Sequence, residues 1–254
     1  METLYDQMRR PASRAPRRRV AVAVISAMLA TLASPWSAAQ TAILGCGNPF
    51  VNGFGPHDYR VEQGQKLKVV EDYHFTQRVE SLISGRSASL GADIDYTLRA
   101  FPNHHRALIS MMNLGARQKN PVPPGAQFSV ECYFTRALQF RPDDAIARMI
   151  YAKYLASNGR KPDAIRELEY TVRTAQENAF TQYNAGMIYF EMGEFDKALL
   201  QAHRALGLGF ERPGLKQQLQ GAGKWVEPAA AASAPDSGVT SAAPASDAGS
   251  QPSR

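Results

Sequence analysis

The chain has 254 residues, of which 44% are hydrophobic and 20% are charged, and its formal net charge is +6. Six arginines and two acidic residues fall within 1–39, so the remainder holds 23 basic and 21 acidic side chains, a net charge of +2. A nucleic-acid-binding surface needs dense neutralisation of phosphate charge, and no lysine-rich stripe with interleaved aromatic residues follows Ala39. Composition therefore removes nucleic acid from the expected partners.

The segment 1–39 has the layout of a secretory signal peptide. Arginines, among them Arg9 and Arg17, precede an apolar run from Val20 to Ala33, and small residues lead up to Ala39. A basic start, a short apolar core and small residues before the cleavage point are typical of export signals. The run has 14 residues, which is short for a bilayer span of about 20. We predict cleavage after Ala39 and export to the periplasm or the medium; an uncleaved segment would anchor the chain in a membrane.

The tetrapeptide Ile43–Cys46 resembles a lipobox, the signal for attaching a lipid to a cysteine through a thioether. A lipobox directly follows the apolar core of its signal, whereas Pro35, Trp36 and Gln40 intervene here. Export without a lipid is therefore the prediction, and a membrane-anchored lipoprotein is the alternative.

The chain has two cysteines, Cys46 and Cys132, and both follow the predicted cleavage point. In an oxidising compartment they allow one intramolecular disulfide. Such a bridge would close a loop of 86 residues, which the chain-entropy argument values at roughly 4–5 kcal/mol as an upper figure. We predict this disulfide; the alternative is two separate thiols, one of them a small buried apolar residue.

Residues recur at a spacing of 34 in the second half of the chain. Gly159 is followed by Gly193, and Ala164 by Ala198. The segment that begins at Ala179 carries a full set of small, aromatic and leucine residues at regular positions: Gly186, Tyr189, Gly193, Phe195, Ala198, Ala202, Ala205 and Leu206. A fixed period of this length is a sign of repeat architecture.

This pattern resembles the tetratricopeptide repeat (TPR), in which each unit is a pair of antiparallel helices. Small residues allow the two helices to pack closely, and glycine suits the left-handed conformation that ends the first helix. The resemblance implies an all-α fold, a short TPR-like solenoid of about three to four helix pairs. It is strongest over 143–212, weaker over 90–142 and absent before Thr76.

We predict a helical repeat domain over 76–227. Its units are a divergent one at 76–102, followed by units at 103–142, 143–178 and 179–212. A final amphipathic helix is expected to cover the exposed end, as solenoids need, and it would contain Leu215, Leu219 and Trp225.

Two further details concern the second unit and the helix starts. The extra six residues of the second unit are expected in the turn 120–125, which contains three prolines and a glycine. Asn103 and Asp143 each follow a proline and are predicted to cap the next helix.

The two ends of the mature chain differ from the repeats. Residues 40–75 are predicted to form an irregular segment whose Phe50 and Phe54 pack on the helices. Residues 228–254 are rich in Ala, Ser and Pro with no aromatic residue, so they cannot bury enough apolar area to offset the entropy of ordering, and a disordered tail is predicted.

Few residues suggest catalysis. His104 and His105 are adjacent, so on a helix their side chains diverge and make a poor metal pair. His57 and Asp58 could act as a general base and its orienting carboxylate, but no motif places a nucleophile beside them. Haem, zinc-helix and phosphate-loop motifs are absent from the sequence, so we predict neither an enzyme nor a cofactor or metal site.

Two acidic residues, Asp93 and Asp95, occur close together in the chain. On a helix they point to different faces, so we interpret them as charges near a helix start, where the helix dipole favours them, and not as a catalytic pair.

The predicted binding surface is the concave face of the TPR-like array, which the first helix of each pair lines. The residues implied for it are Ile146, Met149, Lys153, Phe180, Tyr183, Met187 and Phe190. Exposed aromatic and methionine clusters usually mark contact sites. We therefore expect a protein–protein interaction scaffold that binds a protein or peptide, with assembly of an envelope, secretion or polysaccharide complex as its context. A binder of a small molecule or glycan in this groove is the alternative, and an enzyme using His57 and Asp58 is a more remote one. The groove would be closed if the chain's own ends filled it.

Overall fold

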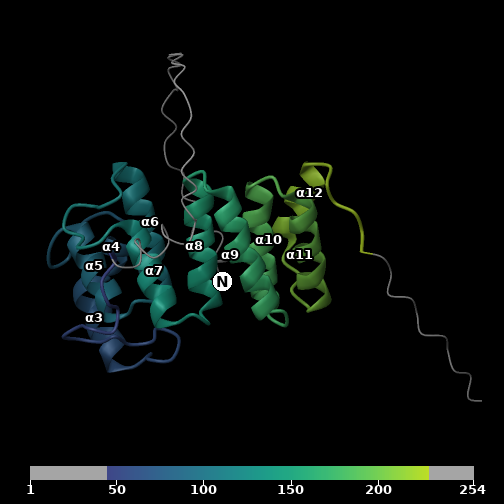
Figure 1. Cartoon of the computed structure of the whole chain (residues 1–254). Helices are drawn as coiled ribbons and strands as arrows, with labels where there is room; N and C mark the ends of the chain where they lie inside the picture. The colour runs from purple at the N-terminus through teal and green to yellow at the C-terminus, as the bar shows by residue number, and fades with distance from the viewer. Residues whose placement is uncertain (1–44, 229–254) are drawn as a thin grey trace, which may run out of the picture.

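The computed structural model describes residues 45–228, and within that range it contains ten α-helices and no β-strand (Figure 1). This confirms the all-α prediction. The helices are α3 (Gln65–His74), α4 (Gln77–Glu80), α5 (Leu90–Ala100), α6 (His105–Gln118), α7 (Val130–Phe140), α8 (Ala145–Ser157), α9 (Lys161–Thr174), α10 (Ala179–Glu191), α11 (Phe195–Gly207) and α12 (Pro213–Gly221). In the described range no helix is long and apolar enough to cross a membrane. The predicted signal peptide (1–39) and all but the first residue of the predicted tail lie outside the described residues.

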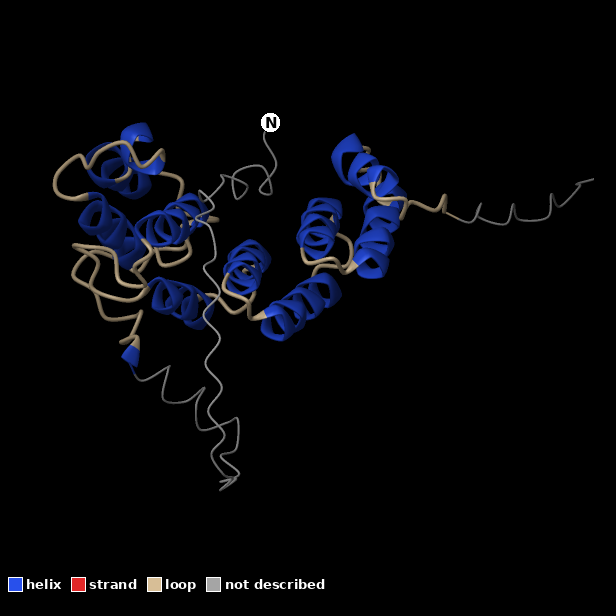
Figure 2. Cartoon of the chain, turned by 90° about the horizontal axis from the view of Figure 1, so that it is seen from above, coloured by secondary structure: helices blue, strands red, loops and turns tan. Residues whose placement is uncertain are grey.

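The second half of the chain consists of two helix pairs, α8 with α9 and α10 with α11. The start of α10 is offset from that of α8 by the same interval that separates Gly193 from Gly159, and α11 is offset equally from α9. Gly159 and Gly193 follow the first helix of each pair with φ angles of +78° and +75°, a conformation that glycine adopts without strain. The expected glycine turns are therefore confirmed. Seen from above, the successive helix pairs are arranged along a curve (Figure 2).

Small residues allow the helices of each pair to approach closely, as the pattern indicates. A Cβ atom added to Gly186 would lie 3.2 Å from the Cβ of Gln201 on α11 and 2.5 Å from Leu215 on α12. Ala164 in α9 and Ala198 in α11 are fully buried. Larger side chains at these positions would force the helices apart, which is costly in a densely packed interior.

The first half departs from a series of equal pairs. Helices α6 and α7 form a pair, and the extra residues lie in the connection 119–129, which confirms the predicted site of the insertion. The unit expected at 76–102 is wrong in form, because α4 is only four residues long and α5 packs mainly against α3 and α6. The segment 40–75 also differs from the prediction, since Gln65–His74 form the helix α3.

The end of the array is covered by α12, as expected. Leu215 and Leu219 are buried against the preceding helices. Trp225 lies beyond the end of α12, not within it, and its ring packs edge-on against His203 of α11 with the ring centroids 5.1 Å apart.

The predicted disulfide is present between Cys46 and Cys132, so the segment before α3 is covalently joined to α7. Because the bond uses the sulfur of Cys46, that sulfur has no valence left for a thioether to lipid. Phe50 contacts Phe140 of α7, with the ring centroids 5.8 Å apart, but 57% of Phe50 remains exposed. Phe54 packs on His57 of its own segment, so only Phe50 docks on the helices as predicted.

A buried polar bridge joins the described residues before α3 (45–64, called the N-terminal segment) to α8. The side chain of Asn103 is completely buried and its amide nitrogen donates to Asp58 Oδ1 at 2.7 Å and to Asp144 Oδ2 at 2.8 Å. Its amide oxygen accepts from the backbone N–H of Tyr59. One side chain therefore satisfies three groups from parts of the chain that are distant from it in sequence.

The helix caps lie one residue later than predicted. His104, not Asn103, caps α6, and its Nδ1 accepts from the N–H of Ala107. Asp144, not Asp143, caps α8 by accepting from the N–H groups of Ile146 and Ala147. Asn103 is therefore left to form the bridge, because His104 takes over the capping.

Replacing Asp144 with alanine is expected to destabilise the protein by about 2–4 kcal/mol. The variant loses a cap, worth about 0.5–2 kcal/mol, and leaves buried donors of Asn103 and His105 without an acceptor, at about 1–3 kcal/mol. Urea unfolding followed by circular dichroism measures the change. Asp143→Ala is the matched control, because the Asp143 side chain is 69% exposed and pairs with Arg60 at the surface, so the loss should stay below about 1 kcal/mol. Equal losses in the two variants would contradict the assignment of the cap.

Candidate functional site

Three of the seven residues predicted to line an open groove are buried in the protein's interior. Met149 is completely buried, and Tyr183 and Met187 are 5% and 3% exposed. Ile146, Phe180 and Phe190 are half-buried and pack against the core. Both methionines and Tyr183 are therefore not exposed as expected, whereas Ile146, Phe180 and Phe190 stay partly exposed.

The chain's own C-terminal part covers this face of α10. The ring of Tyr183 lies 5.1 Å from that of Phe210, which precedes α12. A Cβ atom added to Gly214 of α12 would come within 2.7 Å of the Tyr183 hydroxyl oxygen. Phe210 also contacts Phe180. The cap that the sequence predicts thus occupies the surface that the same sequence suggests as a groove.

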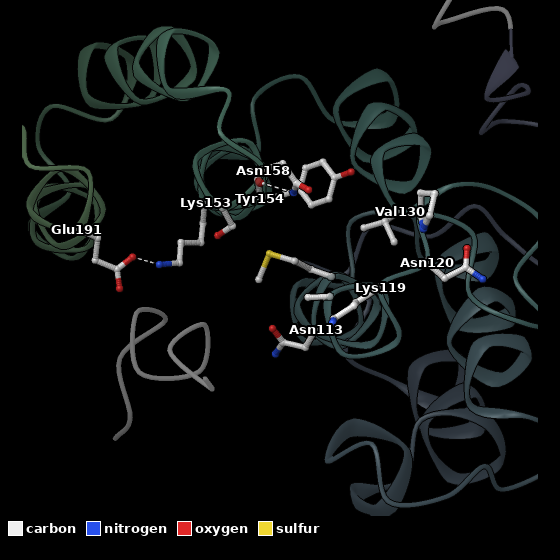
Figure 3. Close-up of a pocket in the computed structure, with 13 residues that line it drawn as sticks. Asn113, Lys119, Asn120, Val130, Lys153, Tyr154, Asn158 and Glu191 are labelled. Carbon is white, nitrogen blue, oxygen red and sulfur yellow. Dashed lines mark hydrogen bonds and ion pairs between the residues drawn. The ribbon is translucent and has the colours of Figure 1, made fainter. Parts of the chain in front are cut away.

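An open pocket of about 540 Å³ remains nearer the middle of the array, and we call it the central pocket (Figure 3). It lies between the C-terminal ends of α6 and α8, with one residue from α10. Its lining residues are Met112, Asn113, Gly115, Ala116, Lys119, Asn120, Pro121, Val130, Lys153, Tyr154, Ser157, Asn158 and Glu191. Of the predicted groove residues, only Lys153 belongs to it.

The central pocket combines one ion pair with amide groups and a small apolar floor. Lys153 of α8 pairs with Glu191 of α10 across the space between the two helices, as Figure 3 shows. Their side chains are only 13% and 24% exposed, which strengthens the pairing relative to one in bulk water. Asn113 and Asn120 stand on the α6 side. The residues that line the pocket include neither histidine nor cysteine, and its amides and ion pair offer both donors and acceptors of hydrogen bonds.

The residues that the sequence reasoning missed lie at the end of each first helix. Asn158 immediately precedes Gly159, and Glu191 lies shortly before Gly193. Apart from Lys153, the predicted positions fall earlier in the same helices, and α12 covers Tyr183 there. A signal was available, because polar residues just before the turn glycines interrupt otherwise apolar helices.

The suggested catalytic pair does not form. The carboxylate of Asp58 accepts hydrogen bonds from Arg60 and Asn103 and pairs with Arg141. Burial alone would raise the pKa of Asp58, but the hydrogen bonds from Arg60 and Asn103 outweigh it and hold the pKa far below its usual range. The ring of His57 instead packs between Phe54 and Phe101. Asp58 therefore acts as a structural anion.

The two adjacent histidines have separate partners, as their spacing predicts. His105 contacts the carboxylate of Asp144, with Nε2 2.9 Å from Oδ2. His104 is completely buried, stacks on Tyr59 with the ring centroids 4.1 Å apart, and places Nε2 3.1 Å from Glu71 Oε1. Because Nδ1 of His104 accepts from a backbone N–H, the neutral ring carries its proton on Nε2.

Asp93 and Asp95 are both buried, and each closes a loop. Asp93 accepts from three successive backbone N–H groups, those of residues 86–88, and lies 3.1 Å from His74 Nδ1. Asp95 accepts from the hydroxyl of Tyr133 and from Arg99. They face different neighbours, as expected, and Asp93 lies in the first turn of α5 as predicted. Asp95 lies beyond that turn, and its hydrogen bonds account for its place in the interior.

Comparisons with protein-family models, with curated proteins and with solved structures found no match to this chain.

Stability should fall as the pH drops below the ordinary histidine value of 6.5, in part through His104. Burial lowers the pKa of His104, while the hydrogen bond with Glu71 acts in the opposite direction. The unfolded chain then binds more protons between the folded pKa and 6.5, so acidification favours unfolding, by at most about 1.4 kcal/mol per pH unit for one group.

Urea unfolding at a series of pH values from 7.5 to 5.5 tests this. His104→Asn keeps an acceptor for the N–H of Ala107 but does not titrate, so we expect a shallower dependence on pH. Part of the slope should remain, since the pKa of His57 is also lowered by burial. An unchanged slope would show that His104 is not the source.

Proposed function

We propose that this chain is a non-catalytic, exported scaffold that binds another protein or peptide in the central pocket. The observation that carries the proposal is that residues from three successive helix pairs line the central pocket. They belong to α6, α8 and α10 and form one polar surface. A surface built from several units in a row suits an extended ligand that runs along the array. Assembly of an envelope, secretion or polysaccharide complex is the context in which we expect it to act.

A TPR-like architecture is part of the same proposal. It is supported by the equal offsets of α8 to α10 and α9 to α11, by the left-handed glycines at 159 and 193, and by the close approach at Gly186. The pairs α8–α9 and α10–α11 carry the likeness. The shorter helices α3–α5 do not.

Export to the periplasm is supported by two independent features. The segment 1–39 is typical of a signal peptide, and the Cys46–Cys132 disulfide fits an oxidising compartment. The disulfide also argues against the lipoprotein alternative, because it uses the same sulfur atom. Membrane association would then depend on an uncleaved signal.

The glycan-binding and enzyme alternatives have less support, because the residues that suggested them are engaged in other contacts. The glycan alternative relied on exposed rings, whereas Tyr183 lies under α12 and Phe190 packs on Phe195. The enzyme alternative relied on His57 and Asp58, whose side chains are engaged separately.

Site-specific photo-crosslinking in the native host tests the proposal. A benzoylphenylalanine at position 113 or 158, both in the central pocket, should give a discrete adduct that protease digests. The same residue in place of Leu200, which is 47% exposed on α11, is the control and should give none. A protease-resistant adduct would favour the glycan alternative, and equal labelling at all three positions, or none, would overturn the proposed surface.

A further inference from the structure

A second, smaller pocket of about 410 Å³ lies where the N-terminal segment meets α5 and α7. We call it the arginine pocket. Its lining residues are Gly47, Asn48, Val51, Asn52, Arg99, Gln127, Phe128 and Arg136. It shares no residue with the central pocket, and it lies beside the disulfide, since Gly47 follows Cys46.

Arg136 is buried in the wall of this pocket without a direct ion pair in the described range. It is only 3% exposed. Its Nη1 donates to the carbonyl oxygen of Cys46 at 3.0 Å, and its guanidinium lies 4.4 Å from the centre of the Phe128 ring. Within residues 45–228 it forms no ion pair with a carboxylate, and its buried Nε has no hydrogen-bond partner. Burying a charge without a directly paired counter-ion is costly. Burial lowers the pKa of Arg136, although the electrostatic effects of Tyr133 and Asp95 act in the opposite direction.

Arg99 adds a second guanidinium to the same lining. Its Nε donates to Asp95 Oδ2 at 2.8 Å, and this is the only hydrogen bond that its side chain makes in the described range. The other oxygen of Asp95 accepts from Tyr133 and from the N–H of Gln127. The nearest carboxylate is thus already engaged, and the residues that line the pocket include no acidic side chain.

The remaining walls would admit a small ligand with both a charged and an apolar part. Phe128 and Val51 supply apolar surface, and Asn48 supplies an amide. Gly47 packs directly over the arginine, because a Cβ atom added there would lie 3.3 Å from Arg136 Nη1 and 3.3 Å from the Phe128 ring. The volume falls in the ordinary range for small-molecule sites, about 300–1,000 Å³.

We propose that the arginine pocket binds an oxyanion, a carboxylate or a phosphate group, between Arg136 and Arg99. The planar fork of a guanidinium matches the two oxygens of such a group. The ligand supplies the direct ion pair that Arg136 lacks within residues 45–228. This site goes beyond the proposed scaffold function, because it shares no lining residue with the central pocket and does not depend on a partner protein.

Thermal unfolding of the mature chain, with its disulfide intact, provides the first test. Sodium phosphate and sodium acetate are titrated separately, each against sodium chloride at the same ionic strength. The expected result is a saturable rise in Tm for at least one oxyanion beyond the effect of chloride. The better of the two identifies phosphate or carboxylate as the preferred group. No difference from chloride would overturn the proposal.

Asn48→Asp provides the second test by building the anion into the chain. The aspartate keeps the oxygen that accepts from the N–H of Phe50 and adds a carboxylate to the pocket lining. Tm in chloride should rise, and the further rise with oxyanion should disappear.

Gln220→Glu is the matched control for Asn48→Asp, since it adds the same charge at an exposed position of α12, and it should respond to the oxyanion as the parent does. Val51→Trp tests occlusion independently: Val51 is 75% exposed, so the indole can fill the pocket without disturbing the core, and the response should again vanish. A full response in both pocket variants, or its loss in Gln220→Glu, would overturn the site.

Discussion

The fold depends on a fully buried amide placed between two carboxylates. Asp58 and Asp144 would repel each other in the interior, yet Asn103 donates to both. Arg60 balances the charge of Asp58, and His105 hydrogen-bonds to Asp144. For Asp144, burial would raise the pKa, but the hydrogen bonds from His105, the backbone and Asn103 outweigh it and lower the pKa. The bridge fixes the start of α8 relative to the segment before α3, which makes that segment part of the helical domain.

This constraint determines which surfaces stay open. The disulfide holds the N-terminal segment against α7, and the Asn103 bridge holds it against the start of α8. Between α5 and α7 this segment shapes the arginine pocket. At the opposite end α12 folds back over α10 and buries Tyr183. Between these two covered ends the central pocket remains, bounded by the Lys153–Glu191 pair. Both proposed sites therefore follow from how the ends of the chain pack on the helices.

Features that repeat along the chain, or that join two cysteines, can be predicted from the sequence. The helix pairs after Ala145, the turn glycines and the disulfide all have local or pairwise signals. The polar bridge has none, because its members are far apart in the chain and no spacing rule relates them. The cap of α8 is predicted at Asp143, one residue before the true cap at Asp144, because either of two adjacent aspartates satisfies the residue preference for helix caps. Arg136 does carry a signal: it lies among Tyr133, Ala137 and Phe140 on the apolar face of α7, where a charge requires a reason.

Native-state hydrogen exchange on Asn103→Ala tests the account most directly. If the bridge integrates the N-terminal segment, protection should fall together at two distant places: at the N–H of Tyr59, which donates to Asn103, and at the N–H of Ala147, which donates to Asp144. The disulfide remains intact in this variant, so any loss reports the bridge and not the covalent link. Loss of protection confined to the first turn of α6, with Tyr59 and Ala147 unchanged, would contradict the account.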